Sequence, residues 1–112
     1  MQPVESSEID TLTYIAAEKA YGRGELDEAK KAFEDYLQNF PAGAFRQNCY
    51  YYKGVICYNQ GASDEAVENF EKVLEFPNSQ YYEEAMTVAA GIHYDNKVYN
   101  KASMLYKQVA EL

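Results

Sequence analysis

The residues that could form a disulfide, or bind a metal through sulfur or nitrogen, are two cysteines and one histidine. Cys49 and Cys57 lie eight positions apart in a segment that we interpret as one helix, which separates them by about 12 Å along its axis. A disulfide needs Cα atoms within about 7 Å, so these two cysteines cannot pair with each other. Their spacing fits no zinc or redox motif, and no histidine is near. We interpret them as buried thiols.

Groups that could perform catalysis are equally sparse. His93 is the only histidine, and Ala20 and Cys57 occupy the equivalent positions of an internal repeat, so we expect it to pack between helices. Carboxylates gather where helices are expected to begin and complement the helix dipole there. They are Asp27, Glu28, Asp64, Glu65, Glu83 and Glu84. No nucleophile–base pair, phosphate loop or metal-ligand spacing is present, so the sequence predicts a non-enzymatic protein without a cofactor or a metal.

Tyrosine is the unusual residue of this chain, at 12 of 112 positions. Its ring and hydroxyl suit contacts with peptides and proteins. Helical spacing places tyrosines and their neighbours in one stripe on each of three helices, with Gly91 inside the third stripe. The predicted partner-binding groove consists of Tyr14, Glu18, Tyr21, Tyr51, Val55, Tyr58, Asn59, Thr87, Tyr94 and Asp95.

Composition narrows the class of protein. The chain is 47% hydrophobic, which suffices for the core of one domain. Its formal net charge of -8 disfavours nucleic acid and anionic membrane surfaces as partners. No apolar run approaches the roughly 20 residues of a membrane helix, so we expect no membrane insertion. The polar, acidic N-terminus does not resemble a signal peptide.

An internal repeat organises the chain. The segment 29–33, Ala-Lys-Lys-Ala-Phe, returns 37 residues later as Ala-Val-Glu-Asn-Phe and 36 residues after that as Ala-Ser-Met-Leu-Tyr. Tyrosines and small residues share this register, and so do two glycines, with a lysine in the third position. The sets are Tyr21, Tyr58 and Tyr94; Ala17, Gly54 and Ala90; and Gly24, Gly61 and Lys97. We expect repeats at about 8–41, 42–77 and 78–112, after a disordered or tag-like segment at 1–7.

Each repeat is predicted to form two antiparallel helices, because apolar residues follow a three-to-four spacing and the turns between them are short. The expected helices span about 8–23, 26–39, 44–60, 63–75, 80–96 and 99–112. Ser7 and Ser79 are the expected N-caps of the first and fifth helices. The small residues let helices cross closely, and an aromatic one turn after each alanine fills the space beyond them. One hairpin cannot bury both faces, so the hairpins should stack.

This pattern resembles the tetratricopeptide repeat family, which has a small residue and an aromatic in its first helix, a glycine at the turn and an alanine and an aromatic in its second helix. The resemblance covers nearly the whole chain from about Asp10 and implies an all-α, right-handed superhelical stack of three helix–turn–helix hairpins. The repeat exceeds the usual 34 residues. With Phe-Pro-Asn-Ser at 76–79, this length resembles a bacterial cell-envelope branch that includes the Tol–Pal-associated periplasmic repeat proteins and the outer-membrane assembly lipoproteins.

The resemblance implies a scaffold that binds a protein or peptide on the concave surface formed by the first helices of the repeats. Family members often have a packing aromatic where Tyr21, Tyr58 and Tyr94 lie, so the resemblance favours packing over binding for these three groove residues, whereas binding is favoured for Tyr14 and Tyr51. Tyr14, Glu18, Tyr51 and Val55 replace the basic clamp with which some members hold a carboxylate, so we expect no such clamp.

An alternative function is self-assembly. The last helix has no successor to cover it, so we expect an exposed apolar face that includes Met104, the stem of Lys107 and Leu112. A homodimer through this helix, or excision of the chain from a longer array, would account for such a face. The resemblance suggests a periplasmic or cell-envelope location, and the sequence leaves a cytoplasmic one open.

Overall fold

The computed structural model describes residues 6–112, with side chains from Glu8 onward. This part of the chain forms six α-helices and contains no strand. The helices are α1 (Ser6–Gly22), α2 (Leu26–Asn39), α3 (Arg46–Asn59), α4 (Ser63–Val73), α5 (Tyr82–Asp95) and α6 (Tyr99–Ala110). The predicted all-α class and the predicted six helices are therefore confirmed.

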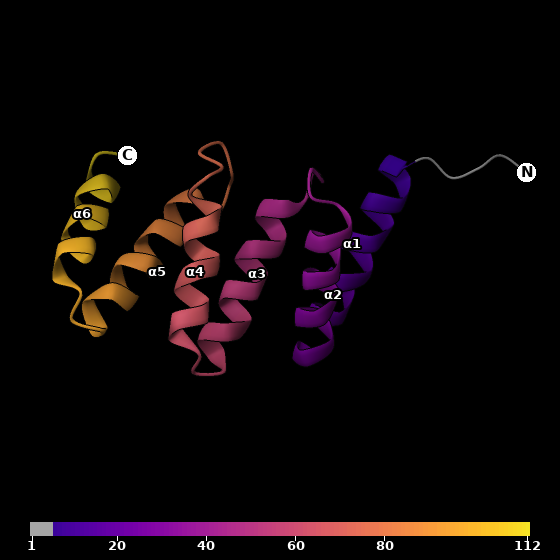
Figure 1. The fold of residues 1–112 in the computed structure, drawn as a ribbon, viewed down its shortest axis with the longest axis horizontal. Coiled ribbons are helices and arrows are strands. Elements are labelled where there is room, and N and C mark those ends of the chain that lie inside the picture. Colours follow the sequence, from indigo (N-terminus) through magenta and orange to yellow (C-terminus); the bar gives the residue numbers. More distant parts are fainter. Residues whose placement is uncertain (1–5) are drawn as a thin grey trace, which may run out of the picture.

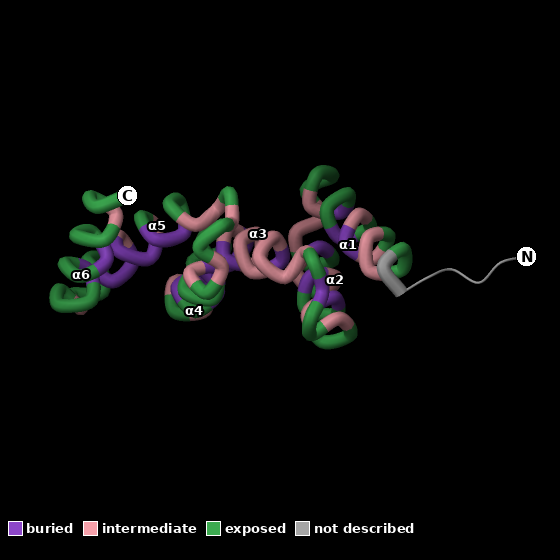
Figure 2. Tube along the Cα trace, turned by 90° about the horizontal axis from the view of Figure 1, so that it is seen from above, coloured by how far each residue is buried: buried purple, intermediate pink, exposed green. Residues whose placement is uncertain are grey.

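The helices form an elongated stack of three hairpins that follow one another along the molecule (Figure 1). The stack measures 57 × 27 × 20 Å. Seen from above, α1, α3 and α5 form one row and α2, α4 and α6 the other (Figure 2). The main contacts join helices that are consecutive in sequence. Each hairpin therefore packs only on its neighbours, as expected for a repeat array.

The predicted helix bounds agree with the structure to within a few residues. Both ends of α2 are as predicted, because Gly24 precedes it and Pro41 follows it. The first helix begins at Ser6, so Ser7 lies inside it and the predicted N-cap is wrong. Residues 1–5 of the predicted disordered or tag-like segment lie outside the described residues.

The fifth helix begins at Tyr82, three residues after the predicted cap. Ser79 caps the preceding turn instead, since its Oγ accepts a hydrogen bond of 3.1 Å from the backbone N–H of Tyr81. Tyr81 itself holds the N-cap position and makes no side-chain cap bond there. An aromatic residue thus stands where a small polar cap would be usual.

The same backbone motif closes the first helix of every hairpin. In the first, the N–H of Glu25 donates to the carbonyl of Ala20 and the N–H of Gly24 donates to that of Tyr21, both at 3.0 Å. This pair of bonds is the Schellman motif, which requires a left-handed residue directly after the helix. The left-handed residues are Gly24 (φ 77°), Gly61 (φ 80°) and Lys97 (φ 64°). The predicted equivalence of Lys97 with the two glycines is therefore confirmed.

Replacing Lys97 with glycine is expected to stabilise the protein by about 1 kcal/mol, because a left-handed backbone strains a residue that has a Cβ. The Tm should rise by a few degrees. The reverse substitution at the equivalent turn, Gly24→Lys, should lower the Tm by a similar amount, since a Cβ there meets no atom within 4 Å and only backbone strain changes. Thermal denaturation followed by circular dichroism measures both variants. A lower Tm for Lys97→Gly would contradict this account.

Small residues let the helices approach closely, as predicted. A Cβ added at Gly54 of α3 would lie 2.8 Å from Cε1 and 2.9 Å from Cζ of Phe70 on α4. The ring of Phe70 is 2% exposed. In the first hairpin Ala17 and Phe33 hold the equivalent positions, and both are fully buried. The crossing is thus a small residue against an aromatic ring in both hairpins.

Tyr36 joins three helices at the first hairpin boundary. The side chain is fully buried on α2, and its hydroxyl donates to the carboxylate of Asp10 on α1. The same oxygen accepts a hydrogen bond of 2.9 Å from the backbone N–H of Phe45, which precedes α3. Burial, and then the bond to Asp10, raise the pKa of Tyr36, so its hydroxyl remains a donor at neutral pH.

The two cysteines and the histidine are buried, as predicted. Both cysteines are free thiols, and burial raises the pKa of Cys49 to about 12, which keeps it protonated at neutral pH. His93 is 7% exposed and lies between α5 and α4, where its Nε2 is 3.4 Å from Oε1 of Glu71. Among the described residues, no group of three or more histidine, cysteine or acidic side chains could hold a metal ion.

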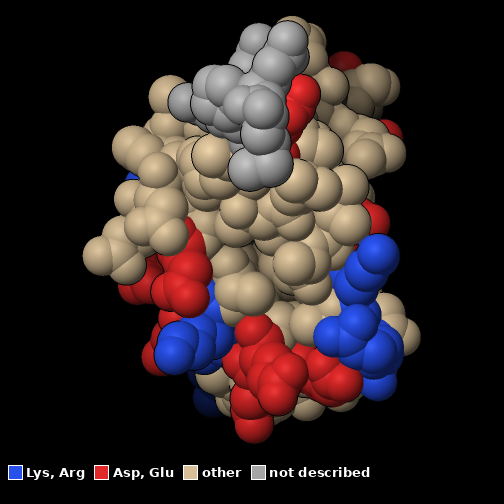
Figure 3. All heavy atoms as spheres, turned by 90° about the vertical axis from the view of Figure 1, so that its right-hand side faces the viewer, with Lys and Arg blue, Asp and Glu red and all other residues tan. Residues whose placement is uncertain are grey.

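Both ends of the stack carry exposed apolar side chains. On α6, Met104 is 53% and Leu112, just beyond the helix, 62% exposed, which confirms the predicted exposure at this end. On α1, Ile9 and Leu12 are exposed too. A view onto the α1 end shows a broad uncharged area, with charged residues gathered mostly along the lower margin (Figure 3).

Candidate partner-binding site

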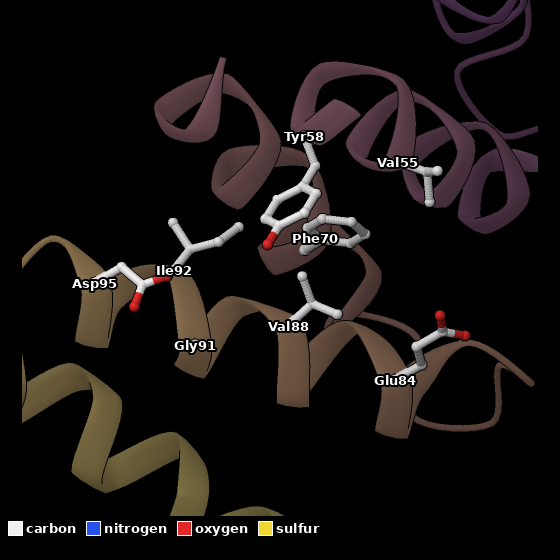
Figure 4. A pocket seen from close by; sticks show the side chains of 8 residues that line it. All are labelled: Val55, Tyr58, Phe70, Glu84, Val88, Gly91, Ile92 and Asp95. Atoms are coloured by element: carbon white, nitrogen blue, oxygen red, sulfur yellow. The ribbon is translucent and has the colours of Figure 1, made fainter. Parts of the chain in front are cut away.

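A hollow of about 320 Å³ lies between α3 and α5, with α4 behind it. Val55 and Tyr58 point into it from α3, and Val88 and Ile92 approach from α5, with the ring of Phe70 between the two helices (Figure 4). The walls are apolar except for the hydroxyl of Tyr58 and two carboxylates on α5. The residues that line the hollow are Val55, Tyr58, Phe70, Glu84, Val88, Gly91, Ile92 and Asp95. A small apolar cleft with few polar groups is the usual form of a binding site.

The repeat register explains why this space is open. Val88 of α5 is in register with Tyr52 of α3, 36 residues earlier. Between the first two hairpins, the ring of Tyr52 packs on Phe33 with centroids 5.4 Å apart and planes 12° apart. Tyr52 therefore occupies the space that the shorter Val88 leaves empty between the second and third hairpins. The smaller side chain at this one position leaves the hollow within an unchanged fold.

The carboxylates stand at opposite ends of the hollow along α5 (Figure 4). Oε1 of Glu84 accepts a hydrogen bond of 2.9 Å from the hydroxyl of Tyr51 on α3. Burial, and then this bond, raise the pKa of Tyr51 to about 12, so the hydroxyl stays protonated and holds Glu84 at neutral pH. Asp95 is exposed at the other end. No lysine or arginine lines the hollow.

The structure brings three of the ten predicted groove residues together around this hollow, namely Val55, Tyr58 and Asp95, and Gly91 of the predicted third stripe joins them. Tyr58 is 51% exposed. This exposure disfavours the packing role that the resemblance implies for Tyr58. The same holds for Tyr94, which is 57% exposed and meets Tyr99 of α6 edge-on at 5.4 Å between centroids.

The prediction that Tyr14 faces a binding groove is also wrong. The residue is 4% exposed, and its ring stacks on Phe45 with centroids 4.4 Å and planes 1° apart. Its hydroxyl donates to Oε2 of Glu18 at 2.8 Å and accepts a bond of 3.2 Å from the side chain of Asn48. We call the contact between the first and second hairpins the first joint, and the contact between the second and third hairpins the second joint. Tyr14 is a core residue of the first joint, because Phe45 covers the face that a bound peptide would need.

Tyr51 makes the same contact in the second joint. It stacks on Tyr81, with centroids 4.1 Å and planes 11° apart, and remains half-buried. The predicted partial exposure of Tyr51 is therefore confirmed. Tyr81 lies 36 residues after Phe45, so the stacking partner belongs to the repeat. This recurring aromatic directly before the first helix of a repeat is a signal that the sequence contains and that our prediction missed.

The remaining predicted residues lie outside the hollow. Tyr21 is half-buried and packs on Tyr52, with ring centroids 4.8 Å apart. Glu18, Asn59 and Thr87 are exposed, and the hydroxyl of Thr87 donates to the carbonyl of Glu83 within its own helix. These residues do not line the hollow.

Four lining residues were not predicted: Phe70, Glu84, Val88 and Ile92. Positions 84, 88, 91 and 95 follow the three-to-four spacing of one helix face, so helical periodicity alone could have found Glu84 and Val88. The predicted stripe used 87, 91 and 94, which is the neighbouring face of α5. Phe70 and Ile92 are core residues whose surfaces form the floor, and only the three-dimensional packing reveals them.

Comparison with known proteins agrees with this architecture. The model of the tetratricopeptide repeat family matches residues 13–42, which comprise most of α1 and all of α2. No curated protein matches the chain. The match to the first hairpin and the stack of six helices together support the tetratricopeptide repeat family. Repeats of this family generally mediate protein–protein interactions and are typically non-enzymatic. Within residues 6–112, no helix is both long and apolar enough to cross a membrane.

Proposed function

We propose that this protein is a non-enzymatic scaffold that holds a protein or peptide partner in the hollow between α3 and α5. The observation that carries the proposal is the open space at the second joint, where the equivalent space of the first joint is filled by Tyr52. An apolar side chain of a partner would take the place that Tyr52 takes in the first joint. Half-exposed Tyr58 would cover it with its ring, and aromatic residues in such positions often dominate binding energy.

Filling the hollow from within is expected to abolish partner binding. The variant Val88→Tyr introduces the residue that the first joint already accommodates, so the fold should survive. Ligands come from a selection of short linear random peptides on the immobilised wild-type protein. We expect selected peptides to bind Val88→Tyr at least about 30-fold more weakly, which corresponds to the roughly 2 kcal/mol of a typical anchor side chain. Fluorescence anisotropy measures the Kd values.

The matched control is Thr87→Tyr, which adds the same side chain at the neighbouring exposed position outside the hollow. It should bind the selected peptides as the wild type does. Circular dichroism establishes that both variants are folded. Equal binding by Val88→Tyr and the wild type would contradict the proposed site, and so would a selection that yields no peptide sensitive to Val88→Tyr.

A finer family assignment also remains a proposal. The repeat of 36–37 residues and the Phe-Pro-Asn-Ser segment at 76–79 support the bacterial cell-envelope branch of the family. Membership of that branch would place the partner among proteins of the cell envelope.

Self-assembly is a second candidate function, and the exposed apolar residues at the two ends of the stack favour it. Tyr99 and Met104 of α6 are each more than half exposed, as is Leu12 of α1. Exposed apolar patches often mark interaction surfaces. A homodimer through α6 would bury Met104, so sedimentation of the wild type and Met104→Lys over a range of concentrations tests it. A wild type that stays monomeric throughout removes this candidate.

A further inference from the structure

The two carboxylates of the hollow are held without a cation. The ion pairs among the described residues join Arg23 to Glu25, Lys30 to Glu65, Lys53 to Glu34 and Lys72 to Glu75, and His93 lies close to Glu71. None involves Glu84 or Asp95. Glu84 is oriented by the neutral hydroxyl of Tyr51, which leaves its negative charge uncompensated. Besides the hydroxyl of Tyr58, the polar groups of the hollow are therefore two carboxylate acceptors for a cationic ligand.

Their separation sets the spacing of the cations. Positions 84 and 95 are eleven residues apart on one helix, which corresponds to a rise of roughly 16 Å. An extended chain advances about 3.3 Å per residue, so roughly five residues span this distance. The apolar walls of Val55 and Val88 lie between the two ends.

We propose that the partner segment is an extended peptide with an apolar side chain seated in the hollow between two lysines or arginines about five residues apart, one on Glu84 and one on Asp95. This inference rests on the proposed function and specifies the partner's chemistry. The half-exposed ring of Tyr58 would assist, since the faces of tyrosine rings attract ammonium and guanidinium groups.

The test repeats the peptide selection on the wild type and on the double variant Glu84→Gln, Asp95→Asn. Wild-type pools should be enriched in pairs of basic residues about five positions apart that flank an aliphatic or aromatic residue. Pools from the double variant should keep the apolar residue and lose the basic pair. The control double variant Asp35→Asn, Glu68→Gln removes the same charges from exposed positions on α2 and α4, in the other row of helices, and should give the wild-type pool.

Affinities of one selected peptide then quantify the effect. Changing both of its basic residues to glutamate should weaken binding to the wild type roughly tenfold, and added salt should reduce the difference. The double variant should bind the two peptides equally. Val88→Tyr distinguishes the proposed site from the proposed cationic partner. Peptides that are sensitive to Val88→Tyr but show no basic pair would overturn the cationic partner alone, whereas peptides insensitive to Val88→Tyr would overturn the site itself.

Discussion

Replacing Gly54 with leucine is expected to destabilise the protein by about 3 kcal/mol or more and to lower its Tm by roughly 10 °C or more. Even the Cβ of the new side chain would lie 2.8 Å from the ring of Phe70. That ring is 2% exposed and also meets Tyr51 edge-on, at 6.2 Å between centroids, so it has little freedom to move aside. Thermal and urea denaturation measure the loss.

The control for this substitution is Gly22→Leu. Gly22 is the last residue of α1, and a Cβ there meets no atom within 4 Å. Because leucine favours a helix over glycine by up to about 1 kcal/mol, this variant should be as stable as the wild type or more so. If the two leucine variants had the same stability, the crossing of α3 and α4 would not depend on the absence of a side chain at Gly54.

Replacing Tyr14 with alanine is expected to cost about 3–5 kcal/mol of stability, as for other fully buried aromatic residues. The variant loses the stack on Phe45 and the tilted contact with Phe33, whose ring centroid is 6.3 Å away. Chemical denaturation measures the change. Tyr14→Phe keeps the ring and should cost only about 1 kcal/mol for the lost hydrogen bonds to Glu18 and Asn48.

This pair of variants separates the two interpretations of Tyr14. A groove residue would lose peptide binding as alanine and leave the stability nearly unchanged. A core residue lowers the stability, and the variant that still folds binds the selected peptides as before, because the hollow lies at the other joint. Unchanged stability of Tyr14→Ala would show that its burial contributes little.

Repetition made the fold predictable from the sequence. Gly24 and Gly61 mark left-handed turns, and their register identified Lys97 as a third such turn, although lysine alone gives no such signal. Likewise, Ala17 and Gly54 share a position at which a helix crosses closely. Each structural role recurs at equivalent positions in two or three repeats, so it can be recognised even where one repeat has an atypical residue.

The site was harder to predict because it depends on a difference between repeats. Tyr52 and Val88 are equivalent by register, yet one fills its joint and the other leaves a hollow. A search for shared tyrosine positions selects what the repeats have in common, namely packing residues such as Tyr14. The hollow could be predicted only by comparing side-chain volumes at equivalent positions of successive repeats.

The hollow has walls that belong to different hairpins, and this has a mechanical consequence. The main contacts run from α3 to α4 and from α4 to α5, so the two walls are connected chiefly through α4, and the hydrogen bond from Tyr51 to Glu84 is a direct link between them. A rotation of the last hairpin about its contact with α4 would change the width of the gap. A ligand that touched both walls would add a further connection across this gap. It would stiffen the stack at the second joint and fix the angle at which the last hairpin is held.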